Sequence, residues 1–288
     1  MALIVLSGLL AFNVRMYRDG ACVQEKGTRH ARTVHDCTLR NPLIMFPGNE
    51  TAWVKMEYPA CPERVEGATM TRIGNSLIES LQGSFEIGIA FVTPFRRSRR
   101  LGWGTFDEEI ENSYPGDELV PEPKWMANHA ISINATPDQV WPWIVQIGQG
   151  RGGFYSYQKL ENLAGSEIEN TSRILEKHQH IRVGDPIKLH VETPPMTVAI
   201  VEEPSALVLY GNPAEADDSA MLSTSWALLL LEQSDGTSRL LSRTRYHHND
   251  DFRSKLLGGP LLLEPISFVM ERKMLKAVSY THLRAHET

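Results

Sequence analysis

The sequence has few cysteines, no excess of positive charge and no long apolar run. Its three cysteines have spacings that fit neither a zinc site nor a disulfide framework. The formal net charge of −6 at pH 7 offers no basic field for a nucleic-acid backbone, so we expect no nucleic-acid partner. The apolar segment 1–12 is too short to span a bilayer and lacks the features of a signal peptide. We expect a cytoplasmic protein that can contact a membrane through its N-terminal region.

Motifs of several common enzyme classes are also missing. There is no Walker phosphate loop, no G-x-S-x-G elbow and no H-E-x-x-H zinc helix. The glycines at 148–150 precede tyrosines, whereas a dinucleotide site needs a strand before it and a continuing helix after it. His178 and His180 could share one side of a strand, but no third metal ligand has a matching spacing. The sequence therefore predicts no cofactor and no metal.

The most distinctive segment is a glycine-rich turn between two short helices, within residues 136–165. The cap pattern at 136–139 and the apolar spacing behind it predict a helix with one face in a core. Glycines at 148–153 end this helix. Aromatic residues at 154–157 then precede a second short helix at 159–163. The segment thus combines a flexible turn, the arginine within it and a group of aromatic rings.

Alternation of apolar and polar residues predicts an antiparallel sheet around this segment. The predicted strands are 129–133, 187–191, 196–200, 207–210, 224–231 and 238–247. The last two form a hairpin, because Asp-Gly at 235–236 favours a tight turn. Strands at this spacing without helices between them indicate an antiparallel meander. A helix from 260 to 277 follows the last strand.

The region before the first strand contains a further amphipathic pattern. Apolar residues at every fourth position from Ile73 to Phe85 predict a short helix, followed by an apolar patch at 87–92 and four arginines within 96–100. Such a patch could lie on a membrane surface. It could also belong to a helix that packs on the domain and leaves a solvated basic edge. We favour the packed helix, because the patch is short and Glu86 interrupts it.

Together these segments resemble the START-like, helix-grip superfamily (SRPBCC), and within it the bacterial polyketide cyclase/dehydrase and lipid-transport-like branch. The resemblance covers residues 103–277 and rests on WGT-x-x-E, PGDELVP, VWPWIVQIGQGRGGFYSY, EN and FVMERKML. It implies an α+β fold in which a curved antiparallel sheet wraps around a long C-terminal helix. Two short helices are expected after the first strand.

The resemblance divides the chain into four parts. Residues 1–69 lack a sustained period and resemble translated intergenic sequence, so we expect a poorly structured, non-native extension. Residues 70–126 are expected to form a helix and an arm that pack on the domain. Residues 127–277 form the helix-grip domain itself. Residues 278–288 resemble adapter sequence read in frame, and we expect an artefactual tail.

Candidate site residues follow from the space that such a grip encloses, because apolar cavities with a few polar groups are the usual ligand sites. The ligand-binding candidates are Trp141, Gln149, Arg151, Phe154, Tyr155, Tyr157, Trp226, Arg243, Arg245 and Tyr246. The catalytic candidates are Arg243, Arg245, Tyr157 and Glu271.

Each candidate has a structural alternative. The period of the last strand does not decide whether Arg243 and Arg245 point inward, toward a ligand, or outward. Arg151 either holds an anionic ligand group or ties the glycine turn to Glu161 or to a carbonyl. The aromatic residues either line a pocket or fill the core. Glu271 is an acid or base if buried, or else the partner of an arginine.

Three functions remain open at this point. The leading hypothesis is binding, including transport, of a hydrophobic or amphipathic small molecule. The first alternative is a cofactor-independent cyclase or dehydratase that acts on a polyketide-like or aromatic substrate. There, Arg243 or Arg245 would polarise a carbonyl while a tyrosine or Glu271 moves a proton. The second alternative is a non-catalytic interaction module whose cavity is filled by side chains.

Overall fold

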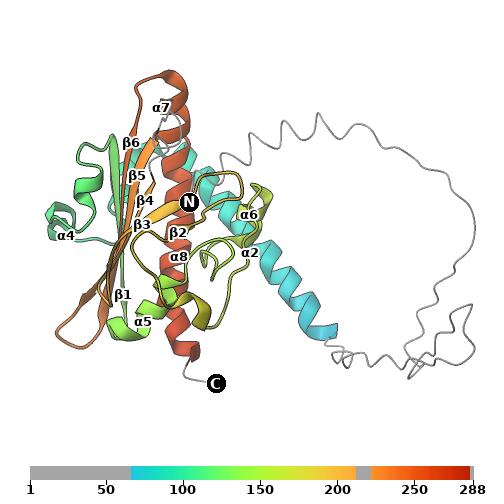
Figure 1. Cartoon of the computed structure of the whole chain (residues 1–288). Helices are drawn as coiled ribbons and strands as arrows, with labels where there is room; N and C mark the ends of the chain where they lie inside the picture. The colour runs from blue at the N-terminus through green and yellow to red at the C-terminus, as the bar shows by residue number, and fades with distance from the viewer. Residues whose placement is uncertain (1–65, 212–221, 286–288) are drawn as a thin grey trace, which may run out of the picture.

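A six-stranded antiparallel sheet forms one layer of the protein, and the long helix α8 lies against one of its faces (Figure 1). The structure is a computed structural model that describes residues 66–211 and 222–285, with side chains over 78–211 and 223–280 except 253 and 257. The predictions for the extension 1–69 and the tail 278–288 fall outside these residues at 1–65 and 286–288, whereas 66–69 and 278–285 are helical. The fold is α+β, and the predicted helix-grip arrangement is confirmed.

The sheet has the strand order β1-β6-β5-β4-β3-β2. The strands are β1 Trp125–Ile133, β2 Pro186–Ile187, β3 Met196–Glu202, β4 Ala206–Gly211, β5 Leu222–Glu232 and β6 Ser238–His248. The helices are α2 Glu66–Val92, η1 Pro94–Arg96, α3 Arg97–Leu101, α4 Asp107–Glu111, η2 Asp117–Leu119, α5 Pro137–Val145, α6 Gln158–Leu163, η3 Glu176–His178, α7 Phe252–Gly258 and α8 Leu263–Ala285. From β2 to β6, each strand pairs with the next along the chain. The first strand, β1, pairs with the last, β6, and forms one edge of the sheet. The two short helices after the first strand, α5 and α6, lie where they were predicted.

The side of the sheet that faces α8 carries the main core. Apolar side chains of the strands, of α5 and of α8 pack there, and Val140, Ile144 and Met270 are wholly buried. At roughly 25 cal/mol per Å² of apolar surface removed from water, this core is the main stabilising contribution to the fold. The predicted end of the last helix was wrong, because α8 continues beyond 277 to Ala285 and Val278 is still in the core.

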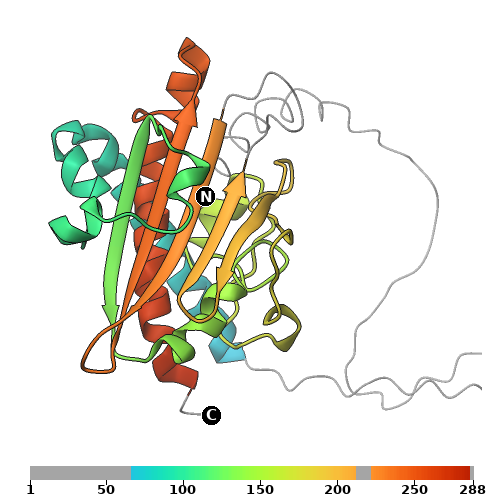
Figure 2. The same cartoon turned by 60° about the vertical axis from the view of Figure 1, so that its left-hand side comes forward.

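The opposite side of the sheet is covered by the arm, residues 103–122 (Figure 2). The backbone N–H of Ala130 donates to the carbonyl of Trp103 at 3.0 Å. Arg239 forms an ion pair with Glu109 at 2.7 Å. The arm is thus fixed by backbone and charged contacts over a smaller apolar cluster that includes Val208 and Leu241.

Helix α2 is longer than predicted, and its apolar face points to solvent instead of to the domain. The predicted apolar face was expected to pack on the domain, yet Leu81 is 71% exposed and Phe85 is 70% exposed. The face toward α6 instead carries Gly83, whose missing Cβ leaves room for Leu160 and Tyr157. Apolar periodicity alone misled the prediction, because this contact is made largely by small and charged residues, with Ile87 and Ala90 at its C-terminal part. No helix within the described ranges is both long enough and apolar enough to cross a lipid bilayer.

Two glycines with similar backbone conformations provide a matched test of how closely the arm lies on β1. Gly104 has φ +76° and Gly150 has φ +74°. A Cβ on Gly104 would overlap the carbonyl oxygen of Ala130, whereas a Cβ on Gly150 meets nothing within 4 Å. We expect Gly150→Ala to cost about 1 kcal/mol from the left-handed conformation alone. Gly104→Ala should cost about 2 kcal/mol more from overpacking. Urea unfolding measures both, and equal losses would contradict the close approach.

Candidate functional site

The aromatic candidates are buried and belong to the core rather than to an open surface. The exposed fractions of Trp141, Phe154, Tyr155, Trp226 and Tyr246 are all 5% or less. Tyr246 stacks on Trp125 with ring centroids 4.4 Å apart. The indole N–H of Trp226 donates to the hydroxyl of Ser242 at 2.9 Å. These rings therefore support the inner side of the sheet whatever else they contact.

The glycine-rich turn is held by hydrogen bonds to protein groups. One Nη of Arg151 donates to the carbonyls of Val145 at 2.8 Å and His178 at 3.2 Å, so this arginine ties the turn to neighbouring backbone. Burial lowers the pKa of Arg151. The side chain of Asn170 accepts from the backbone N–H of Phe154 at 3.0 Å and of Tyr155 at 2.8 Å. The turn is thus tied to neighbouring backbone at several points.

Two further side chains at the turn, Gln149 and Tyr155, are also hydrogen-bonded. The side-chain oxygen of Gln149 accepts from the backbone N–H of Glu167 at 3.3 Å. The hydroxyl of Tyr155 accepts from Gln146 at 2.7 Å and donates to the carbonyl of Trp143 at 3.1 Å. Burial raises the pKa of this phenol.

Tyr157 and the two arginines of β6 contact different parts of the protein. The hydroxyl of Tyr157 donates to Glu86 of α2 at 3.2 Å, and burial raises its pKa to about 12. Arg243 and Arg245 contact Asp117 of the arm at 3.1 and 3.4 Å, so they lie on the side of the sheet away from α8. Burial lowers the pKa of Arg243. The structure does not bring the catalytic candidates together.

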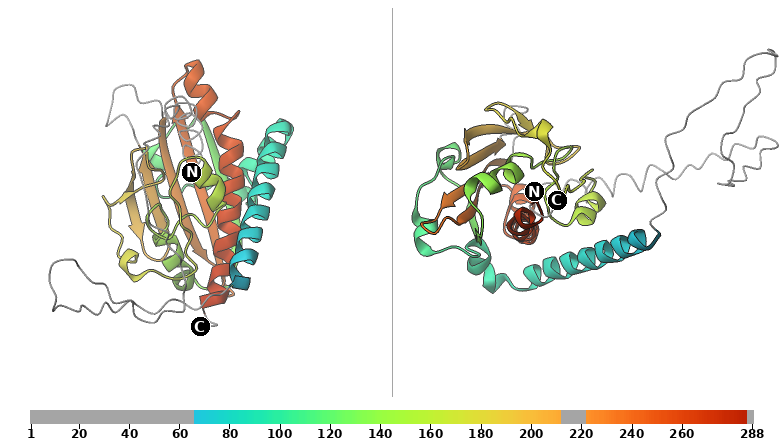
Figure 3. Two further views of the ribbon diagram at one scale, coloured as in Figure 1. Left: turned by 90° about the vertical axis from the view of Figure 1, so that its right-hand side faces the viewer. Right: turned by 90° about the horizontal axis from the view of Figure 1, so that it is seen from below.

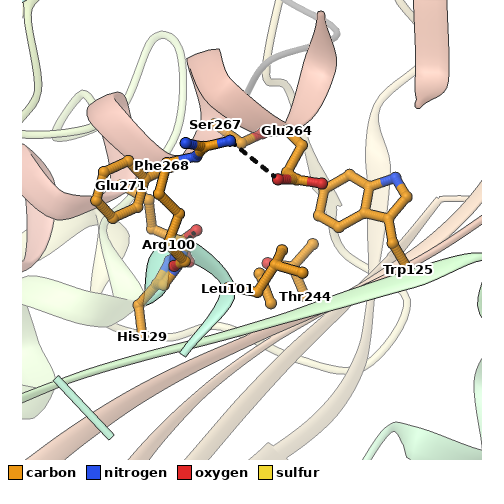
Figure 4. Close-up of a pocket in the computed structure, with 10 residues that line it drawn as sticks. Arg100, Leu101, Trp125, His129, Thr244, Glu264, Ser267, Phe268 and Glu271 are labelled. Carbon is orange, nitrogen blue, oxygen red and sulfur yellow. Dashed lines mark hydrogen bonds and ion pairs between the residues drawn. The ribbon is translucent and has the colours of Figure 1, made fainter. Parts of the chain in front are cut away.

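Glu271 belongs to a buried polar chain between α8 and the sheet. Figure 4 draws it together with His129 and Arg100, two other members of the chain. Its carboxylate lies 2.9 Å from Nδ1 of His129 and accepts from the hydroxyl of Ser242. The other ring nitrogen of His129 lies 2.8 Å from the carbonyl of Arg100, which can only accept. That nitrogen therefore donates to the carbonyl, and Nδ1 faces the carboxylate. One alternative had expected an arginine as the partner of Glu271. The partner is instead a histidine, His129.

A small cavity adjoins this chain but has no room for an organic ligand. It is lined mainly by Trp125, His129, Glu264, Phe268 and Glu271, and measures about 10 Å³. That is about the room of one water molecule.

Arg97 binds Glu264 at 2.7 Å, while burial raises the pKa of that carboxyl. A Ser–Glu–His chain also differs from a nucleophilic triad, in which the histidine contacts the serine.

Sequence reasoning noticed Glu161 only as a partner for Arg151, yet it is the most unusual ionisable group in the structure. It lies on the buried side of α6 with an exposed fraction of 0%. Neither of its carboxylate oxygens has a hydrogen-bond partner among the described residues, and neither does the hydroxyl of nearby Ser166. Burial raises the pKa of Glu161 to about 8. Because buried carboxyls are almost always paired, this one is the leading candidate for a polar contact with a ligand.

Other recesses in the described part of the molecule are open to solvent. One, of about 350 Å³, lies beside the glycine-rich turn and is lined by residues that include Tyr155, Asn170, Lys273 and Tyr280. Another, of about 640 Å³, lies between the arm and the β5–β6 hairpin near Arg239. Neither brings two of the predicted site residues together. Over the described residues, no group of three potential metal ligands is present.

Comparisons with known proteins give two solved structures with weak similarity and no sequence match. No protein-family model matches the chain, and no curated protein sequence matches it. Protein MLL2253 from Mesorhizobium loti is 15% identical, covers 56% of this chain and 98% of its own, and has a TM-score of 0.32. Norcoclaurine synthase from Thalictrum flavum is 13% identical, covers 60% of this chain and 94% of its own, and has the same TM-score. At these scores neither similarity carries an argument about function.

The Glu271–His129 pair can be tested by unfolding. Glu271→Gln removes the carboxylate that pairs with the buried His129 ring. We expect this to lower the free energy of unfolding by about 3 kcal/mol. Glu232→Gln, on an exposed residue, should change it by less than about 0.5 kcal/mol. The double variant His129→Leu with Glu271→Met removes both charges and should be more stable than Glu271→Gln alone. A double variant that is less stable would contradict a buried charge pair.

Proposed function

We propose that the protein belongs to the START-like helix-grip superfamily, in its bacterial polyketide cyclase/dehydrase and lipid-transport-like branch. The order of elements supports this assignment: β1, two short helices, the remaining strands and then the long helix α8. The segments that carry the resemblance occupy the turn after α5, the arm and α8. We further propose that the protein binds a hydrophobic or amphipathic small molecule on the inner side of the sheet.

The observation that carries the binding proposal is the buried carboxyl of Glu161, which has no hydrogen-bond partner among the residues that the structure describes. Its pKa of about 8 means that the carboxyl is mostly protonated at neutral pH. A protonated carboxyl donates a hydrogen bond as well as accepting one. The ligand would therefore have an apolar body and a carbonyl or hydroxyl group that meets Glu161. Leaving such a group unpaired costs about 1–3 kcal/mol, which a ligand recovers.

Binding is favoured over a cyclase or dehydratase by the placement of the catalytic candidates. An enzyme of that kind needs a carbonyl-polarising cation and a proton-transfer group at one reacting centre. Arg243 and Arg245 instead face the arm, Tyr157 contacts α2, and Glu271 is enclosed with His129. The interaction module stays a second candidate, because the buried aromatic residues fill part of the interior themselves.

Bound ligand can be detected by native mass spectrometry of the protein purified from its host. We expect a co-purifying non-protein mass on the wild type and on Glu167→Gln, an exposed neighbour of the proposed anchor. Glu161→Leu should reduce the bound fraction about tenfold, since it removes a hydrogen bond worth roughly 1–1.5 kcal/mol. A wild type without any bound mass, in several extracts, would favour the interaction module.

The pH dependence of stability tests the state of Glu161 without any ligand. Between its ordinary value of 4.5 and about 8, the folded state holds a proton that the unfolded state has lost. Stability from this group is therefore complete below about pH 4.5 and decreases as pH rises toward 8. Relative to Glu161→Gln, which does not titrate, the wild type should lose up to about 1.4 kcal/mol per pH unit in this window. A constant difference between the two proteins from pH 4 to pH 8 would show that Glu161 has a partner.

A further inference from the structure

A row of large apolar side chains on α2 faces away from the rest of the protein. Ile78, Leu81, Phe85, Ile89 and Val92 are 63%, 71%, 70%, 41% and 74% exposed. Their spacing of three, four, four and three residues places them along one face of the helix. We call these five residues the α2 stripe. A helix on the surface of a soluble domain normally turns such a stripe to the core, so its exposure indicates an interaction surface.

The orientation of α2 is fixed by its other face. Glu86 pairs with Arg272 of α8 at 2.7 Å, and Glu79 pairs with Lys273 at 3.1 Å. Gly83 lies against α6 between these two contacts. Figure 3 shows α2 beside α8 at the edge of the molecule, seen from the side and from below. The stripe is therefore held outward by the contacts that anchor the helix.

Two exposed cations lie just beyond the C-terminal end of the stripe. Phe95 is 78% exposed, and Arg96 and Arg99 are exposed as well. Neither arginine forms an ion pair with a side chain that the structure describes, whereas Arg97 and Arg100 both lie near Glu264 of α8. The stripe thus continues into an apolar ring flanked by uncompensated positive charge.

We propose that the α2 stripe binds the surface of an anionic lipid bilayer. The apolar side chains would enter the boundary between headgroups and acyl chains, as amphipathic helices do when they lie in the interface plane. Arg96 and Arg99 would meet lipid phosphates, and each basic residue near an anionic surface adds about 1 kcal/mol. The binding surface is separate from Glu161, so this inference is independent of the proposed ligand.

Charge favours a bilayer over a second copy of this chain. The acids of the helix between 78 and 92 are Glu79 and Glu86, and both are already paired with α8. A second α2 stripe therefore has no free carboxylate to offer Arg96 or Arg99. In a parallel pair of helices, each Arg96 would also approach the same residue of the other copy, which is repulsive.

The test is flotation of the full chain with two kinds of vesicle, one of phosphatidylcholine alone and one of equal parts phosphatidylcholine and phosphatidylglycerol. We expect the wild type to bind the anionic vesicles at least about tenfold better, with the preference weakening as salt is raised. Leu81→Ser with Phe85→Ser should lower binding to the anionic vesicles at least about tenfold, because each side chain buries substantial apolar area. Arg96→Gln with Arg99→Gln should remove most of the preference for anionic vesicles.

The matched control is Val183→Ser with Val191→Ser, which removes two exposed apolar side chains from another part of the surface. It should bind like the wild type, and circular dichroism should show that every variant is folded. A wild type that stays unbound on both kinds of vesicle would overturn the proposal. Binding that survives the Leu81/Phe85 substitutions would also overturn it. The proposal would also be overturned if the protein formed a dimer that does not bind vesicles and that Phe85→Ser dissociates. That result would identify a second copy of the chain as the partner of the α2 stripe.

Discussion

The position of α8 against the sheet depends on the burial of one carboxylate, that of Glu271. A buried charge is costly unless it is paired and hydrogen-bonded, and here His129 of β1 and Ser242 of β6 supply both contacts. Trp226 of β5 extends the chain of hydrogen bonds, and the carbonyl of Arg100 closes its other end. The single helix is thereby fixed to three neighbouring strands and to α3. The network adds directional contacts to the apolar packing of α8.

The two sides of the sheet differ in the contacts that they make: one is mainly apolar and the other carries the ion pairs of β6. The side facing α8 buries the aromatic residues, while the other side holds the arm through Arg239, Arg243 and Arg245. The arginines of β6 therefore attach the arm. The polar groups in the interior are other residues, among them Glu271 and Glu161. Glu161 is the member of that set whose carboxylate lacks a partner among the described residues. The three arginines of β6 are ion-paired with the arm, whereas the Glu161 carboxyl has no hydrogen-bond partner among the described residues. This contrast is why binding is the function that we propose.

Much of the fold could be predicted, because period-two alternation in the strands and cap residues before α5 are local signals. The direction of a side chain relative to the whole sheet is not local. Arg243 and Ser242 alternate in the same strand, and only the tertiary placement of α8 and the arm decides which side each one faces. The same limit applies to α2, where a regular apolar spacing indicates a helix but does not say what covers its apolar face. Glu161 could not be singled out either, since burial of one charged residue in a six-residue helix leaves no pattern in sequence.

The central claim is that the interior beside Glu161 accepts a ligand, and electron density is its most direct measurement. Crystals of the protein purified from its host, without added ligand, should show non-protein density within hydrogen-bond distance of the Glu161 carboxyl, with an apolar portion against the inner side of the sheet. Density that contains only protein, with the Glu161 carboxyl bonded to another residue of the chain, would contradict the account.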